Sequence, residues 1–531
     1  MQVRRLAAWT ALPVALALGL SACGSNGSGS GGSSDAIVRQ GIGDPEHLVP
    51  SNTVESNGSD VLNALYTPLM NYDQDGKVTF DGAAGDSIES TDSKMWTVKL
   101  KDGFTFHNGE KVTSQSYIDA WNYGAYGPNA QVGTDFYNKI DGYAALQGTA
   151  PATKEMTGLK KVDDLTFTVT LSSPFAEWRK VMGYNVFLPL PAAGLADMAA
   201  FENAPIGQGP FKMKGKWEHD KQIETELYDK YPLDKPKVKG VLFKIYADQD
   251  TQYNDLLAGN LDIQTQLPST KLSTAKNDLG DRMRQSPSSY YAWLTVPTYD
   301  TEFAKTEIRQ AISKAINRDE ITKNIFADTY NAASGWVSPV VEGAREDVCG
   351  DACKFDAAKA KSMYTAAGGL PGNKLSIYYN SDGGHKEWVD AVCNQLKNNL
   401  GIDCVGAPVA KFAELRQQAR AHTLKGLLRG AWTFDYPSME NYLRPLMGTG
   451  GSSNDSQYSN PAFDQLLSQG DAATSSADAI KKYQEAEDIA AKDLPLIPLW
   501  FKENIYGYST KVKNVELDLQ QHVNLFKVEA A

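Results

Sequence analysis

A carboxylate surrounded by aromatic residues stands out in the segment GLLRGAWTFDYPSMENYLRPL, residues 426–446. The apolar run that opens this segment predicts a strand buried on both faces, and Pro437 disfavours helix at the residue before it. Asp435 therefore follows the end of a strand, where α/β sheets bind their ligands. Its aromatic neighbours are Trp432, Phe434 and Tyr436. An acid among aromatic rings suits a ligand that carries a cation beside apolar surface. The alternative is that Asp435 caps the next helix or closes the turn.

The usual motifs of catalysis are absent from the sequence. It contains no HExxH, no GxSxG and no Walker A sequence. The six histidines show no pair at helical ligand spacing: His47, His107, His219, His385, His422 and His522. We interpret His107, which precedes an Asn-Gly turn, as a hairpin residue rather than a base. We therefore expect no catalytic residue, no metal and no cofactor, and a secreted hydrolase is the less favoured alternative.

Aromatic residues recur at predicted strand ends and turns, namely Tyr66, Tyr290, Tyr291, Trp293, Trp336 and Trp432. We expect most of them to belong to the core. The remainder would form an apolar-walled cleft with a few polar anchors, which is typical of ligand sites. Because of their positions at strand ends, Tyr66, Trp293 and Asn380 are further candidates for ligand contact.

The N-terminus predicts export. Arg4 and Arg5 precede an apolar run, residues 6–20, which is too short to span a membrane and is typical of a signal peptide. The sequence Leu-Ser-Ala-Cys that ends it, residues 20–23, looks like a bacterial lipobox, with residues 1–22 removed and Cys23 lipidated. An ordinary cleavage site with an incidental cysteine is the alternative. Residues 25–34 are almost all Gly and Ser, so residues 23–35 would form a flexible tether.

The other four cysteines lie in two local pairs, Cys349 with Cys353 and Cys393 with Cys404. Two disulfides in an oxidising compartment are the natural interpretation. A metal site is the alternative, but His385 is the only histidine near either pair and zinc ligands usually come in tighter motifs.

Length and composition indicate a large globular protein. At 531 residues, two to four domains are expected. The formal net charge of −12 and the pI of about 5.2 argue against a nucleic-acid partner. Strand-like and helix-like segments alternate along the chain, which predicts an α/β protein. They include a strand at 104–107 leading into the Asn108-Gly109 turn, a helix at 308–316 and a strand at 496–501.

Several stretches together resemble the extracytoplasmic solute-binding proteins of peptide ABC transporters (family 5 solute-binding proteins). The stretches are LYTPL (65–69), WTVKLKDGFTFHNGEKVTSQSYIDAW (96–121), IGQGPF (206–211), QAISKAINR (310–318) and PLIPL (495–499). They span the chain from about residue 36 to its end. In the oligopeptide-binding members a Trp-x-x-Asp-Tyr segment holds the α-amino group of the peptide. Residues 432–436 match that segment, so the resemblance assigns this role to Asp435.

The resemblance implies a two-lobed fold of the type II periplasmic-binding-protein class, with a ligand cleft between the lobes. We expect lobe I at 36–72 and 205–290, an extra subdomain at 73–204, lobe II at 291–502 and a C-terminal return to lobe I at 503–531. The implied ligand is a peptide, most of all an oligopeptide, contacted by Asp435, Trp432, Tyr436, Phe434, Trp293, Tyr66 and Asn380. A dipeptide, a metal chelate, an opine or a sugar is the alternative.

The resemblance also implies the partners and the location. A monomer would deliver its peptide to the permease subunits of an ABC transporter, touch the membrane only through its lipid anchor and bind no nucleic acid. It would sit on the outer face of the bacterial cell membrane.

Overall fold

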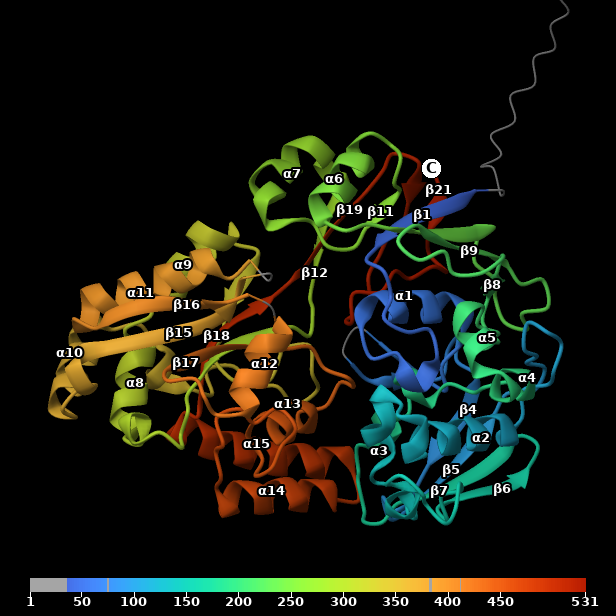
Figure 1. Ribbon diagram of the computed structural model, residues 1–531, viewed down its shortest axis with the longest axis horizontal. Coiled ribbons are helices and arrows are strands. Elements are labelled where there is room, and N and C mark those ends of the chain that lie inside the picture. The colour runs from blue at the N-terminus through green and yellow to red at the C-terminus, as the bar shows by residue number, and fades with distance from the viewer. Residues whose placement is uncertain (1–35, 74–75, 382–383, 411) are drawn as a thin grey trace, which may run out of the picture.

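A computed structural model describes residues 36–531 except 74, 75, 382, 383 and 411. Within this part of the chain, the strands form three larger sheets in three bodies, and two of these bodies are lobes that face each other across a gap in the ribbon (Figure 1). The predicted signal peptide, Cys23 and the tether lie outside the described residues.

Lobe I is built on a seven-stranded mixed sheet with the order β12-β19-β11-β1-β10-β9-β8. Its centre is β1 (Ile37–Ile42), which pairs in parallel with β10 (Gly240–Ile245) on one side and β11 (Ile263–Gln264) on the other. The remaining strands are β8 (Phe211–Met213), β9 (Gln222–Leu227), β12 (Met283–Ser286) and β19 (Asn504–Tyr508). Its helices are α1 (Ser56–Leu65), α6 (Gln249–Leu257) and α7 (Leu272–Leu279).

Lobe II is built on a six-stranded mixed sheet. In spatial order its strands are β14 (Tyr330–Ala332), β18 (Leu496–Lys502), β13 (Tyr291–Thr295), β17 (Leu427–Trp432), β15 (Lys374–Asn380) and β16 (Asp403–Val409). Its helices are α8 (Thr306–Lys314), α9 (Arg318–Phe326), α10 (Ala357–Ala366), α11 (Lys386–Leu400), α12 (Phe412–Arg420), α13 (Glu440–Met447), α14 (Pro461–Asp471) and α15 (Ser476–Asp493).

The third body, called the subdomain below, lies under lobe I in Figure 1. Its antiparallel sheet has the order β4 (Gly85–Glu89), β5 (Met95–Leu100), β7 (Thr166–Thr170) and β6 (Leu159–Asp163). The helices that follow along the chain are α2 (Ser114–Ala125), α3 (Trp178–Val181), α4 (Ala192–Ala196) and α5 (Met198–Asn203). Two small ribbons complete the strands: β2 (Asn71–Tyr72) with β3 (Val78–Thr79), and β20 (Val512–Lys513) with β21 (Glu529–Ala530).

The packing divides the molecule into two parts. Lobe I and the subdomain share one continuous core, in which Val38 and Val241 of lobe I join Trp121 and Phe167 of the subdomain. Lobe II has its own core, which includes Trp336 and Trp500. A separate core is what allows lobe II to move as a unit.

Two neighbouring strand connections carry the chain between these parts. β12 leads into β13 and β18 leads into β19, and β12 pairs antiparallel with β19. Figure 1 shows β12 and β19 side by side between the two lobes. Two paired connections of this kind can serve as a hinge about which two lobes rotate.

Local sequence explains the elements that matter most for the site. The helix predicted at 308–316 is α8, whose apolar face lies in the lobe II core. The predicted strand before Asp435 is β17, but only Leu427 and Leu428 are fully buried, and the last four residues are half-buried. The strand predicted at 104–107 is reduced to a single bridge between Thr105 and Lys111, although Gly109 has the positive φ of the predicted turn.

The cysteine pairs lie in lobe II as predicted from the sequence. Cys349 is joined to Cys353, with 5.7 Å between their Cα atoms, and Cys393 to Cys404, with 4.9 Å. The second pair ties α11 to the start of β16. Both bridges therefore reinforce lobe II locally and do not cross the cleft.

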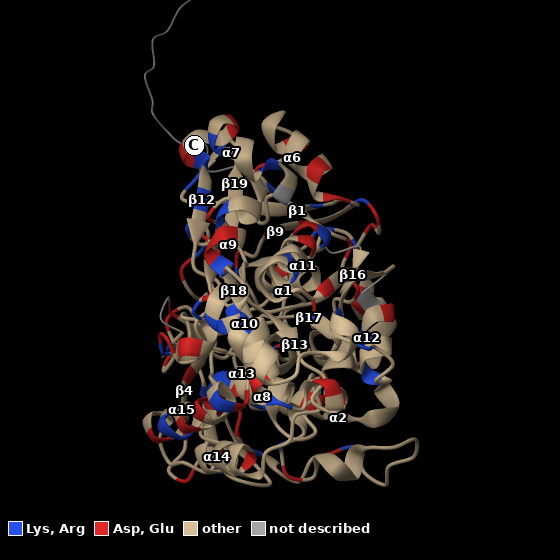
Figure 2. Ribbon diagram, turned by 90° about the vertical axis from the view of Figure 1, so that its left-hand side faces the viewer, with Lys and Arg blue, Asp and Glu red and all other residues tan. Residues whose placement is uncertain are grey.

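Charges of both signs are mixed over the surface of lobe II. Lys and Arg alternate with Asp and Glu on the helices that face the viewer in Figure 2. Among the described residues, no helix combines the length and apolarity that crossing a membrane requires.

Candidate functional site

A pocket of about 910 Å³ opens between the lobes. Its walls come from α1, the β2–β3 ribbon, the residues around 183–188 and 231–234, and the C-terminal segment 518–526. Phe434 is the contribution of lobe II to this lining. The walls of the pocket are therefore formed by lobe I, by the subdomain and by the lobe II loop that carries Asp435.

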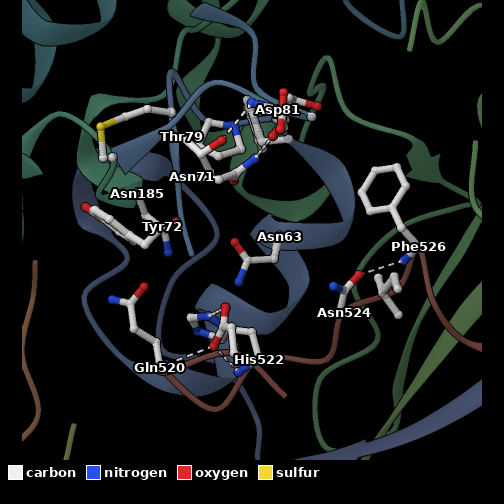
Figure 3. Close-up of a pocket in the computed structure, with 18 of the residues that line it drawn as sticks. Asn63, Asn71, Tyr72, Thr79, Asp81, Asn185, Gln520, His522, Asn524 and Phe526 are labelled. Atoms are coloured by element: carbon white, nitrogen blue, oxygen red, sulfur yellow. Dashed lines mark hydrogen bonds and ion pairs between the residues drawn. The ribbon is translucent and has the colours of Figure 1, made fainter. Parts of the chain in front are cut away.

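Side-chain amides and hydroxyls share the pocket lining with apolar residues. Asn63 projects from α1 into its centre, with Tyr72 and Asn185 on one side, Asn524 on the other, and Gln520 and His522 at its base (Figure 3). The side-chain amide of Asn63 forms no hydrogen bond with another described residue. Donor and acceptor atoms are therefore available to the backbone of a ligand. This lining is more polar than the apolar-walled cleft expected from the sequence.

The Asp435 side chain is held by Asn441 of α13. Asn441 Nδ2 donates to Asp435 Oδ2 at 3.1 Å, and the Asp435 backbone N–H donates to Asn441 Oδ1 at 2.9 Å. Trp432 Nε1 donates to the same oxygen at 3.2 Å. A single buried amide thus fixes the aromatic residue and the acid relative to each other.

Asp435 is half-buried and has no cationic partner. Within the described part of the chain, no Lys, Arg or His side chain lies at ion-pair distance from it. Protein surrounds this position in the cleft, and the burial raises the pKa of Asp435 from 3.8 to about 6, with a smaller opposing effect of the Asn441 hydrogen bond. Its negative charge also helps to raise the pKa values of Tyr72 and Tyr184, after their own burial. Both tyrosines line the pocket, so the carboxylate lies close to its wall, although Phe434 and not Asp435 is the lining residue from this loop.

The helix that follows does not depend on Asp435. α13 begins at Glu440, and the Glu440 backbone N–H donates to Ser438 Oγ at 3.1 Å. The carboxylate of Asp435 instead contacts the side chain of Asn441. The capping alternative considered for Asp435 therefore has no hydrogen bond to support it.

The other sequence-predicted residues occupy three kinds of position. Tyr66 and Phe434 line the pocket. Trp432 and Tyr436 flank Asp435, and the Tyr436 hydroxyl donates to Glu440 Oε2 at 2.5 Å. Trp293 and Asn380 lie in the lobe II sheet, outside the lining of this pocket, and are 4% and 3% exposed.

Trp293 packs over Gly430 of the neighbouring strand. A Cβ atom at Gly430 would come within about 2.2–2.6 Å of the indole ring, so the glycine makes room for it. The indole Nε1 donates to Thr295 Oγ1 at 2.8 Å. Asn380 Oδ1 accepts from Arg429 Nε at 2.9 Å, at the end of β15 that faces the cleft.

The base of the pocket holds a small charged group. Burial lowers the pKa of His522, but Asp518 and Asp60 outweigh it and raise that pKa to about 9. Asp518 Oδ2 lies 3.2 Å from His522 Nδ1. His522 is the cationic side chain in the lining of this pocket, which contains no Lys or Arg. Asp73, Asp81 and Asp234 contribute acids to the same lining. The electrostatics favour a cationic group in the pocket.

Most of the polar residues of the site were not found from the sequence, among them Asn63, Tyr72, Tyr184 and Asn441. Asn63 lies between the apolar residues Leu62 and Ala64 near the end of α1, and Asn441 is the second residue of α13, directly before Tyr442 and Leu443. A buried amide in such a run is a usable signal, because it needs a partner. The two tyrosines carry no local signal.

The arrangement is suited to binding a ligand. The described residues contain no group of three or more His, Cys, Asp or Glu side chains arranged to hold a metal ion. Among the described residues, the site presents the Asp435 carboxylate without a cationic partner, the side-chain amide of Asn63 and aromatic walls, which suit a ligand with an ammonium group and a polar backbone.

A family model described as "Bacterial extracellular solute-binding proteins, family 5 Middle" matches residues 82–454. The "Oligopeptide-binding protein OppA" of Bacillus subtilis (strain 168) is 26% identical over 524 residues, covering 93% of this chain and 94% of that protein. The "Periplasmic oligopeptide-binding protein OppA" of Escherichia coli (strain K12) is 24% identical over 482 residues, covering 88% and 87%.

Solved structures agree with the architecture. The substrate-binding protein CtaP from Listeria monocytogenes superposes with a TM-score of 0.81 at 20% identity, covering 93% of this chain and 99% of that chain. The OppA complex of Haemophilus influenzae with RPPGFSPFR gives a TM-score of 0.77 at 21% identity, covering 94% and 100%. The predicted two-lobed α/β fold and the resemblance stated from the sequence are confirmed.

Proposed function

Because this chain belongs to the family 5 bacterial extracellular solute-binding proteins, we propose that it captures peptides by their free α-amino group and delivers them to an ABC importer. Proteins of this family act outside the cytoplasm as binding proteins and are not enzymes. The names of the relatives and the properties of the site support a peptide, most of all an oligopeptide, as the solute.

The observation that carries the proposal is the unpaired carboxylate of Asp435. A half-buried acid with a raised pKa is costly unless a cation joins it. The α-ammonium of a peptide supplies that cation and forms a charge-assisted hydrogen bond. A ligand with no ammonium group, such as a sugar, would leave the acid unpaired.

The rest of the peptide would lie extended along the pocket. Its backbone N–H and C=O groups would meet the amides of Asn63, Asn71 and Asn185, so the affinity would depend little on the side chains of the peptide. Trp432, Phe434 and Tyr66 would cover apolar parts. Water between the ligand and the polar walls would adapt to different side chains.

Mass spectrometry of the ligand that a gently purified chain retains tests the peptide assignment. The expected result is a mixture of intact peptides with free N-termini. If the retained ligand is a sugar, an opine or a metal chelate, the peptide assignment is wrong and that compound is the solute. Peptides found only as cleavage products would favour the hydrolase alternative.

The lipid anchor belongs to this proposal as well. If Cys23 is acylated, its lipid chains contribute about 0.8 kcal/mol per buried CH₂, and two chains suffice for stable attachment. Cys23→Ala should therefore release the protein from the membrane or leave it unprocessed. Membrane fractions that still contain the mature variant would contradict the anchor. A monomer bound to the permease subunits is the expected working state.

A further inference from the structure

Lobe II touches the subdomain at the end of the cleft opposite the hinge. Figure 1 shows α3 beside α14 and α15 at the bottom of the molecule, whereas β12 and β19 cross at the top. The Ala176 backbone N–H donates to the Asp471 carbonyl at 2.9 Å, and Ser93 Oγ donates to the Ala473 carbonyl at 2.8 Å. These contacts join two parts that otherwise have separate cores.

Each part also inserts a residue into the core of the other. Ala176 of the subdomain is 6% exposed and belongs to the lobe II core. Tyr436 of lobe II is 7% exposed and belongs to the core shared by lobe I and the subdomain. Both residues would be uncovered if the lobes separated. Tyr436 is also the residue directly after Asp435.

Opposite charges face each other across the same contact. On the subdomain side, Lys139 Nζ lies 3.6 Å from Asp471 Oδ2, and Lys180 Nζ lies 3.5 Å from Glu342 Oε2. In both pairs the cation belongs to the subdomain and the acid to lobe II. Lys180 is also paired with Glu177 of its own subdomain at 2.8 Å, so the Lys139 pair is the one that most favours approach of the two surfaces.

Within lobe II, the negative charges of Glu440 and Asp471 are not fully neutralised unless Lys139 of the subdomain is present. Arg444 is shared by two carboxylates, with Nε 2.8 Å from Glu440 Oε1 and Nη2 2.7 Å from Asp471 Oδ2. Two acids and one guanidinium leave a net charge of −1 in a largely buried cluster. Lys139 supplies the missing positive charge only when lobe II lies against the subdomain.

This cluster is connected to the ligand acid through α13. Glu440 accepts the Tyr436 hydroxyl, and the next residue, Asn441, holds the Asp435 carboxylate. One helix therefore carries both the support of the ligand acid and the charges that meet the subdomain. A shift of Asp435 toward a bound ammonium would be transmitted to Glu440 and Arg444.

We propose that Tyr436, Glu440 and Arg444 are positioning residues that couple capture of the peptide amine at Asp435 to closure of lobe II on the subdomain, with Lys139 and Asp471 holding the closed state. This inference rests on the proposed function, since it requires a ligand amine at Asp435. A bound peptide then dissociates only after the Lys139–Asp471 contact opens.

The kinetics of peptide release test the coupling. The probe is RPPGFSPFR with a C-terminal fluorophore, and its dissociation is followed by stopped flow from the wild-type chain, Lys139→Gln, Tyr436→Phe and the control Lys160→Gln. Lys160 is an exposed lysine of the same subdomain on β6. Dissociation from Lys139→Gln and from Tyr436→Phe should be about three- to tenfold faster, since a partly exposed contact contributes modestly. Lys160→Gln should match the wild type.

A second readout separates coupling from a general loss of structure. Deuterium exchange at the Ala176 amide should slow when the probe is added to the wild type and should change much less in Lys139→Gln. The double variant Lys139→Gln, Asp471→Asn should release the probe no faster than Asp471→Asn alone.

The two levels of the proposal fail in different ways. A wild-type chain that binds neither this probe nor any other free-amine peptide would overturn the proposed function and the coupling together. A wild type that binds the probe, with Lys139→Gln and Tyr436→Phe releasing it at the rate of Lys160→Gln, would overturn the coupling alone. Unchanged Ala176 exchange on binding would do the same.

Discussion

Asp435 and Asp471 are two acids of lobe II, one on each side of α13, and they differ in their partners. Burial raises the pKa of each. Asp471 is paired with Arg444 at 2.7 Å and with Lys139 at 3.6 Å, and its Oδ1 accepts the Tyr483 hydroxyl at 3.0 Å. Asp435 has only the amide of Asn441.

The difference separates a structural acid from a ligand acid. A buried carboxylate that the protein itself neutralises contributes to the fold, whereas one that it leaves without a cation lowers stability until a ligand arrives. Asp435 follows the end of β17 and Asp471 is the last residue of α14, and both have buried surroundings, so their partners are what distinguishes them. The variants below use this contrast.

The largest expected effect is that of Asp435→Asn on peptide affinity. Leaving a buried ammonium without its partner costs about 3–5 kcal/mol, so the affinity should fall by about two to three orders of magnitude. The free energy of unfolding of the ligand-free chain at pH 7 should rise. The pKa of Asp435 in the fold lies above its ordinary value, so stability present below pH 4 is lost as the pH rises through about 6. If chemical denaturation shows reduced stability of the variant and calorimetry shows unchanged affinity, Asp435 would be a structural acid like Asp471.

Asn441→Leu should have the next largest effect. The variant removes the hydrogen bonds to the Asp435 carboxylate, to its backbone N–H and to Trp432. A hydrogen bond to a charged group contributes about 1.5–3 kcal/mol, so affinity for a free-amine peptide should fall by about ten- to a hundredfold. Calorimetry with an N-acetylated peptide is the control, because that ligand should lose much less. Equal losses for both peptides would mean that Asn441 supports the lobe rather than the acid.

Lowering the pH should weaken binding by about tenfold between pH 7 and pH 5, because Asp435 with a pKa of about 6 becomes neutral over this range. A bound ammonium favours the ionised carboxylate, so the affinity is highest above pH 6 and falls as protons compete. The peptide should carry an amidated C-terminus and no titrating side chain. Asp435→Asn, titrated in parallel, should show a nearly flat profile. A wild-type profile as flat as that of the variant would contradict the assignment.

Asp471→Asn should show the smallest effect on affinity and a clear effect on stability. Arg444 and Tyr483 lose a charged partner, which should lower the free energy of unfolding by about 1–3 kcal/mol. The equilibrium affinity for a peptide should change less than tenfold. Chemical denaturation and calorimetry on one preparation give both values. A loss of affinity as large as that of Asp435→Asn would remove the distinction between the two acids.

The sequence indicated the position of Asp435 after a strand better than it indicated the pocket nearby. The strand before Asp435 is visible as an apolar run, and its motif resembles that of the family. Both disulfides close short loops, so their pairing needs only local spacing. These features depend on residues that are near one another in the chain.

The rest of the site depends on contacts between distant segments. Tyr72, Tyr184 and Gln520 meet only because the C-terminal segment returns to lobe I and the subdomain packs beneath it. Trp293 is of a residue type that often contacts ligands, yet its side chain fills the space above Gly430 in the lobe II sheet. A strand-end position does not indicate which face of the sheet a side chain occupies once a tertiary partner competes for it.

The most direct measurement of the central claim is calorimetry on four combinations: wild type and Asp435→Asn, each with a free-amine peptide and with its N-acetylated form. If Asp435 holds the amine, either change alone should cost about two to three orders of magnitude in affinity, and the second change should add little to the first. If the two losses add in full, Asp435 does not hold the amine, and the peptide is anchored elsewhere in the cleft.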